Sequence, residues 1–198
     1  MFYKRYPKEF AFLAKRYEGE ELIALDTETT GLDPKRDELL SIAAIPIQGN
    51  EVMVSKALYL LVRPKGSIDK ESIKVHKLRS CDLKEAVEPK EAIERLLYFI
   101  QNRPLVGYYL EFDMKILSRY TKELFGFALP NRAIEVSGLY YDYKQKLIPQ
   151  GFIDLRFDTI LEDLRLPRFS HHNALSDAVM SALIYLTLRR HYGKRSYF

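Results

Sequence analysis

The sequence has very little cysteine and lacks any long apolar run. Cys81 is the only cysteine in 198 residues, which excludes an intramolecular disulfide and a zinc site built from several cysteines. No stretch approaches the roughly 18 apolar residues of a membrane-spanning helix. The N-terminus, M-F-Y-K-R-Y-P-K-E-F, lacks the apolar segment of a signal peptide. These absences predict a cytoplasmic protein without a membrane partner.

The charge and composition describe an ordinary globular chain. Basic residues outnumber acidic ones, 31 to 27, and the net charge of +4 favours an anionic partner such as nucleic acid only weakly. Hydrophobic residues make up 47% of the chain, which is enough for a real core. There is no internal repeat and no long linker. We therefore expect one domain over 1–198, with a helical extension at 1–19 and the core at 20–192.

The apolar periodicity predicts three consecutive strands, followed by strands that alternate with helices. This order is typical of an α/β fold in which helices cover one mixed sheet. The stretch at 138–153, rich in tyrosine and lysine, reads as a helix or a loop insertion. The expected strands are 21–26, 39–47, 52–62, 104–107 and 133–136, and the expected helices are 8–17, 70–77, 84–101, 112–125, 156–164 and 174–190.

Two acids follow the apolar run of the first predicted strand, in L-D-T-E-T-T-G. Residues two apart on a strand project from the same face, so Asp26 and Glu28 point together if the strand persists to Glu28. Paired carboxylates repel each other, and burying them raises a pKa or recruits a cation. Such oxygen ligands suit Mg²⁺ or Mn²⁺. The alternative for a bare D-x-E is an acidic strand end in solvent.

Two further stretches place acids at helix starts. Asp113 opens a helix after a short apolar strand, where an acid also simply complements the helix dipole. Asn173 is a candidate N-cap that puts Asp177 about one turn into the last helix. Asp177 falls among apolar residues, where an unpaired carboxylate is costly. His172 precedes this helix and is close enough to share a site, although a lone histidine is usually structural or solvated.

Together, D-T-E-T-T-G, an apolar strand leading to F-D, and H-x-A-x-x-D resemble the DEDDh 3′–5′ exonucleases of the ribonuclease H-like superfamily. The resemblance spans 21–190. It implies a five-stranded mixed sheet, with three antiparallel strands plus two parallel, flanked by helices. It also implies two divalent metal ions, Mg²⁺ or Mn²⁺, and a histidine base chosen over His171 by its five-residue step to Asp177. The implied metal ligands are Asp26, Glu28, Asp113 and Asp177, and the implied general base is His172.

The resemblance implies hydrolysis of single-stranded nucleic acid from its 3′ end, DNA ahead of RNA, with release of nucleoside 5′-monophosphates. Two alternatives stay open: a proofreading subunit acting with a DNA polymerase, and a non-catalytic nucleic-acid-binding or accessory module of the same fold. The implied substrate contacts are Thr29, Thr30, Gly31, Leu32, Tyr108, Tyr109 and Phe112.

The chain departs from the family pattern ahead of F-D, where Tyr108 and Tyr109 replace a histidine–asparagine pair. The two tyrosines either stack on bases or fill the edge of the core. The 138–153 stretch either touches nucleic acid or packs as a surface helix. The basic tail is a solvated helix end or a binding segment, and the first helix clasps the core or mediates self-association. The oligomeric state is left open.

Overall fold

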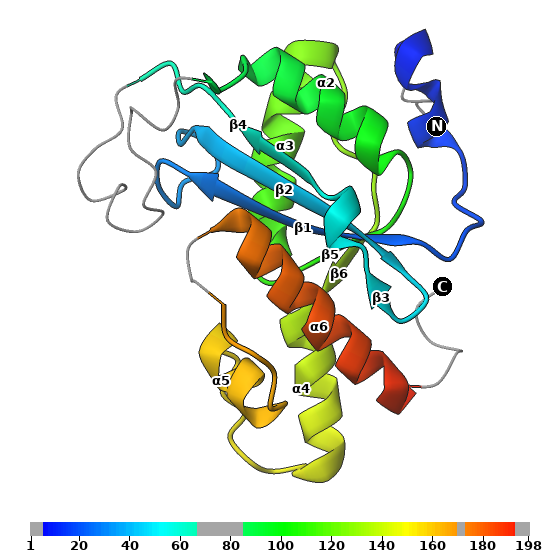
Figure 1. Cartoon of the computed structure of the whole chain (residues 1–198), viewed down its shortest axis with the longest axis vertical. Coiled ribbons are helices and arrows are strands. Elements are labelled where there is room, and N and C mark those ends of the chain that lie inside the picture. Colours follow the sequence, from blue (N-terminus) through cyan, green and yellow to red (C-terminus); the bar gives the residue numbers. More distant parts are fainter. Residues whose placement is uncertain (1–5, 67–84, 170–172, 193–198) are drawn as a thin grey trace.

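The computed structural model describes residues 6–66, 85–169 and 173–192. A mixed sheet runs through the molecule, and helices cover both of its faces (Figure 1). In chain order the elements are η1 (Lys8–Ala14), β1 (Leu22–Thr29), β2 (Leu39–Gln48), β3 (Glu51–Val52), η2 (Val54–Lys56), β4 (Leu58–Leu61), α2 (Pro89–Ile100), β5 (Leu105–Gly107), α3 (Leu110–Phe125), β6 (Ala133–Glu135), α4 (Val136–Leu147), α5 (Phe157–Asp163) and α6 (Ala174–Tyr192).

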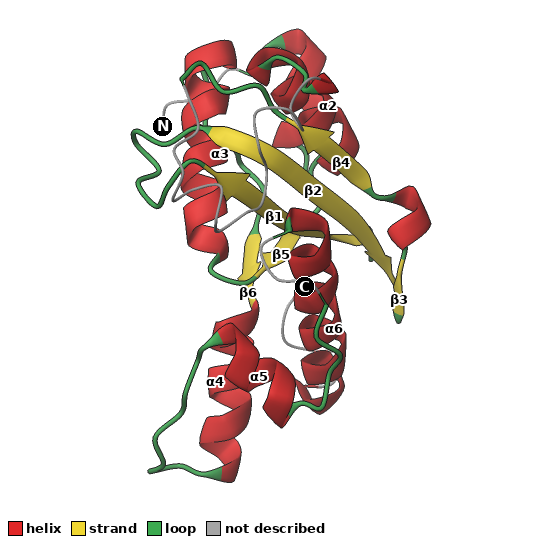
Figure 2. Cartoon of the chain, turned by 60° about the vertical axis from the view of Figure 1, so that its left-hand side comes forward, coloured by secondary structure: helices red, strands yellow, loops and turns green. Residues whose placement is uncertain are grey.

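The sheet has the predicted mixed topology. Its strand order is β3-β2-β1-β5-β6, and β4 pairs with β2 as well (Figure 2). β1 and β2 are antiparallel, whereas β1, β5 and β6 are parallel to one another. Because β3 and β4 occupy successive parts of the same β2 edge, the sheet has five positions. The α/β class and the three-plus-two arrangement are therefore confirmed.

The third predicted strand, 52–62, is wrong as one continuous element. It is split into β3 and β4 by the 3₁₀ turn η2. The split lies opposite Pro46 of β2, whose carbonyl accepts a 2.8 Å bond from the Met53 N–H. Because proline has no N–H, Pro46 cannot donate the second hydrogen bond of this pair, and the ladder is interrupted there. Pairing resumes where Ala44 meets Leu58.

The observed helices also begin and end at other residues than the apolar periodicity predicts. The first is a 3₁₀ helix that ends at Ala14, so the predicted 8–17 helix is too long; Phe10 and Leu13 are its buried residues. α2 begins at Pro89, where the fixed φ of proline suits a first helical turn. The 138–153 stretch contributes most of α4, which ends at Leu147. The predicted 70–77 helix lies outside the described residues.

Strand alternation divides the core between the two faces of the sheet. Ile23 and Leu25 of β1 belong to the apolar cluster formed with α2 and α3. Leu22 and Ala24 belong to the cluster formed with α4, α5 and α6. α6 crosses one face of β1 and β2, and α3 lies on the other (Figure 1). Within the described part of the chain, no helix is both long and apolar enough to cross a membrane.

Candidate metal and catalytic site

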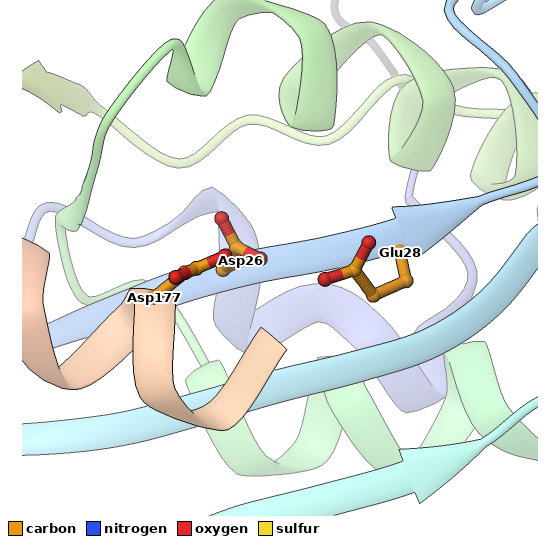
Figure 3. A group of neighbouring side chains, drawn as sticks. All are labelled: Asp26, Glu28 and Asp177. Atoms are coloured by element: carbon orange, nitrogen blue, oxygen red, sulfur yellow. The ribbon is translucent and has the colours of Figure 1, made fainter. Parts of the chain in front are cut away.

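Asp26 and Glu28 lie on the α6 face of the sheet. β1 continues to Thr29, so the strand persists through both acids and continues the alternation of Leu22 and Ala24. Both side chains are half-buried. Figure 3 shows their carboxylates on the same side of β1. The predicted common direction of the pair is therefore present.

Asp177 reaches the same place from the first turn of α6. Asn173 caps this helix, since its Oδ1 accepts bonds from the N–H groups of Leu175 (3.1 Å) and Ser176 (3.3 Å). One carboxylate oxygen from each of Asp26, Glu28 and Asp177 lies within 4.8 Å of the other two (Figure 3). The strand and the capped helix thus bring Asp177 next to two acids that are far from it in sequence.

Asp113 approaches β1 from the opposite face. It is buried in the first turn of α3, and its Oδ1 accepts a 2.6 Å hydrogen bond from the Thr27 hydroxyl. Thr27 alternates with Asp26 and Glu28, so it faces α3 as Leu25 does. Asp113 is not a member of the three-acid group. The fourth predicted ligand, Asp113, is therefore held outside the three-acid group by its hydrogen bond from Thr27.

Asp113 and Asp177 both raise the pKa values of the two acids on β1. Burial raises the pKa of Asp26 well above its ordinary value, and Asp113, Asp177 and Glu28 raise it further. Burial, followed by Asp177 and Asp113, raises the pKa of Glu28 to about 8. Burial raises the pKa of Asp113 to about 7, although the Thr27 hydroxyl acts in the opposite direction. Asp113 is thus electrostatically part of the site.

The donor set fits divalent metal ions. Of the side chains in the described part of the chain, those that shift the pKa of Asp26 or Glu28 are all acids. Among the described residues, neither carboxylate forms an ion pair with lysine or arginine. Neighbouring half-buried carboxylates such as Asp26 and Glu28 need protons or metal ions to offset their repulsion. Oxygen ligands of this kind suit Mg²⁺ or Mn²⁺.

The predicted 3′-nucleotide residues follow β1 in a loop organised by Asp37. The Thr30 hydroxyl donates to Asp37 Oδ1 over 3.0 Å, and the Thr29 hydroxyl donates to the Gly31 carbonyl over 2.6 Å. A Cβ at Gly31 would lie 2.6 Å from Asp37 Oδ2, so a larger residue there would displace this carboxylate. Leu32 is 86% exposed. Of these four residues, Leu32 is the one whose side chain is open to a ligand.

The two tyrosines at the departure from the family pattern have different environments. The Tyr108 hydroxyl donates to the Leu155 carbonyl over 3.0 Å, and its ring centroid lies 4.6 Å from that of Phe157. Tyr109 is 65% exposed and nearly parallel to Phe112, with an interplanar angle of 11° and centroids 6.3 Å apart. Tyr108 therefore packs at the core edge, and Tyr109 presents a ring to solvent.

One predicted site residue, the general base His172, lies outside the described residues, as does His171. Three supporting residues were missed from sequence: Thr27, Asp37 and Glu135. Thr27 had a signal, because strand alternation within D-T-E sends it to the face opposite the acids. Asp37 and Glu135 had none, since each acts through contacts that the local pattern does not encode.

A protein-family model described as exonuclease matches residues 23–185. The chain is 28% identical over 170 residues to the PolC-type DNA polymerase III of Thermotoga petrophila, covering 86% of this chain and 12% of that polymerase. It is 25% identical over 166 residues to the DNA polymerase III subunit epsilon of Aquifex aeolicus, covering 84% and 79%. The chain thus spans about an eighth of the polymerase and most of the subunit.

Solved structures share the fold at low sequence identity. Exonuclease I of E. coli in complex with a dT13 oligonucleotide superposes with a TM-score of 0.73 at 13% identity, covering 86% of this chain and 41% of that one. The shared architecture is the mixed α/β sheet with flanking helices.

Proposed function

The chain belongs to the exonuclease family, and on that premise we propose that it is a metal-dependent 3′–5′ exonuclease. Its substrate is single-stranded nucleic acid, DNA ahead of RNA, and its products are nucleoside 5′-monophosphates. One observation carries the proposal: three carboxylates of a chain in this family converge within 4.8 Å at the end of β1.

Asp26, Glu28 and Asp177 would hold the divalent ions, with Asp113 completing the set from the α3 side of β1. When bound, two Mg²⁺ or Mn²⁺ ions supply stabilisation of the charge on the attacking and leaving oxygens of the phosphodiester. The carboxylates themselves offset the charge of the ions. Their raised pKa values favour proton release as metal binds.

His172 is the proposed general base. It directly precedes Asn173, the observed cap of α6, and lies five residues before Asp177. A histidine titrates near neutral pH and can accept the proton of the attacking water. Leu32 and Tyr109, both exposed, are the proposed contacts to the 3′ nucleotide. An open aromatic face can stack on any base, which suits a substrate read without sequence preference.

The test is an assay on 3′-labelled oligonucleotides with Mg²⁺, with Mn²⁺, and with EDTA. Single-stranded DNA, a duplex with a mismatched 3′ end, RNA and a short oligoribonucleotide are compared in parallel. We expect stepwise release of labelled mononucleotide with either metal and none in EDTA. A folded protein that binds Mn²⁺ and yet releases no mononucleotide would support the non-catalytic accessory module instead.

The relatives favour a second candidate, proofreading alongside a DNA polymerase. Two of them are named as a PolC-type polymerase III and as a polymerase III epsilon subunit. In this role the chain would remove mismatched 3′ ends while bound to a polymerase. Co-purification of the chain with a polymerase, together with faster cleavage of mismatched than of matched 3′ ends, would distinguish this role from a free nuclease.

A further inference from the structure

A fifth carboxylate, that of Glu135, lies at the end of β6 and joins three elements. Its Oε1 accepts bonds from the Tyr109 N–H (3.1 Å), the Ser137 N–H (3.1 Å) and the Ser137 hydroxyl (2.8 Å). Its Oε2 accepts a 2.8 Å bond from the Leu110 N–H. The side chain therefore caps the N-terminus of α4 and, from another strand, that of α3.

The N-terminus of α3 depends on this capping by Glu135. Its N-cap residue is Tyr109, whose side chain makes no capping bond and whose φ of 52° is left-handed. Such a conformation is unfavourable for a residue with a bulky side chain and needs support from its surroundings. The first N–H groups of a helix also need acceptors from outside it. Glu135 provides both, because it binds the N–H groups of Tyr109 and Leu110.

The helix start that Glu135 holds is the one that carries Asp113. Space there is tight: a Cβ at Gly107 would lie 2.9 Å from the Leu25 carbonyl oxygen, so β5 turns into α3 directly against β1. The buried Asp113 then meets Thr27 at 2.6 Å. A short hydrogen bond of this kind fixes the carboxylate only while the first turn of α3 keeps its position.

We propose that Glu135 is a positioning residue for the metal site, acting through the first turn of α3 on Asp113 and Tyr109. Four hydrogen bonds engage its two oxygens, so its contribution is to orient the backbone at the start of α3. The inference rests on the proposed function, since it presumes that Asp113 takes part in holding metal. Partners that orient metal ligands typically contribute about 10- to 100-fold to metal affinity or activity.

The test compares Glu135→Gln and Glu135→Ala with a matched control, Asp163→Ala. Asp163 also ties helices together, and within the described residues its side-chain hydrogen bonds go to α4, from the Tyr140 hydroxyl (3.0 Å) and Lys144 Nζ (3.0 Å). For each variant, Mn²⁺ is titrated against thermal stability without nucleic acid, and turnover is then measured over the same Mn²⁺ range. Glu135→Gln keeps the size of the side chain and serves where the alanine variant does not fold.

We expect the Glu135 variants to need about 10- to 100-fold more Mn²⁺ for half of the maximal stabilisation. Excess Mn²⁺ should then restore much of their turnover. Asp163→Ala should lose thermal stability and keep the wild-type Mn²⁺ midpoint. Wild-type midpoints in both Glu135 variants would overturn the inference alone. A wild-type chain that Mn²⁺ does not stabilise would overturn the proposed metal site along with it.

Discussion

The two faces of β1 hold their acids in different ways. On the α6 face, Asp26, Glu28 and Asp177 converge within 4.8 Å, and Asp177 raises the pKa of both Asp26 and Glu28. On the α3 face, Asp113 is buried and held by a 2.6 Å hydrogen bond from the Thr27 hydroxyl. One strand thus presents a repelling cluster on one side and an anchored single carboxylate on the other.

The difference separates two ways in which the four proposed metal ligands would act. The cluster stores electrostatic repulsion, which a cation relieves. The anchored acid lies outside the three-acid group but raises the pKa of Asp26 and Glu28, so its contribution depends on its exact placement. We therefore expect substitutions on the α6 face to act mainly through charge, and substitutions on the α3 face to act mainly through geometry.

The largest effect is expected from Asp26→Asn, which removes a charge from the centre of the cluster. Metal stabilisation of a phosphodiester transition state is worth several kcal/mol, so turnover should fall by about 1000-fold or more. End-labelled oligonucleotide cleavage measures this loss, and exposed Asp142→Asn on α4 is the control. A variant that keeps a tenth of wild-type turnover would remove Asp26 from the site.

The second effect concerns stability and pH on the α6 face. The pKa of Glu28 rises from 4.5 to about 8 on folding. Between these values the native chain retains a proton that the unfolded chain has released, so metal-free stability falls as pH rises through this window. Glu28→Gln cannot titrate and should exceed wild type by at least about 2 kcal/mol at pH 8, since one pKa unit corresponds to about 1.4 kcal/mol.

Thermal unfolding in EDTA between pH 4.5 and pH 8 measures this difference, which should shrink steadily toward the acid end. The exposed Glu91→Gln on α2 is the control and should follow wild type throughout. Parallel curves for wild type and Glu28→Gln would mean that the cluster is not under electrostatic stress.

The third effect tests the α3 face by geometry alone. Thr27→Val keeps the shape of the side chain and removes the hydroxyl that donates to Asp113. We expect about a tenfold rise in the metal concentration needed for half-maximal turnover, as for other partners that orient metal ligands. Thr121→Val, which removes a buried hydroxyl of α3 bonded to the Ser118 carbonyl, is the control. If Thr27→Val and Thr121→Val raise this metal concentration equally, the Thr27 hydrogen bond has no specific role in placing Asp113.

The α6 face was predictable from sequence, and the α3 face was only partly so. The two-residue period placed Asp26 and Glu28 together, and the Asn173 cap placed Asp177. The side from which Asp113 approaches depends on where β5 ends and on Glu135, which is 25 residues away from Leu110. The break opposite Pro46 likewise depends on which edge of β2 lacks its N–H. Local patterns encode periodicity and caps, and they do not encode such long-range contacts.

The smallest effect separates the two tyrosines that precede α3. Tyr109→Ala removes an exposed ring, so stability should hold while the KM for single-stranded DNA rises about tenfold, as expected for the loss of one base-stacking contact. Tyr108→Phe removes the bond to the Leu155 carbonyl and should cost about 1 kcal/mol of stability with little change in KM. Steady-state kinetics and thermal unfolding of both variants give the two readouts. If Tyr108→Phe alters KM and Tyr109→Ala does not, the core-edge tyrosine is the substrate contact, and the exposed ring belongs to another surface.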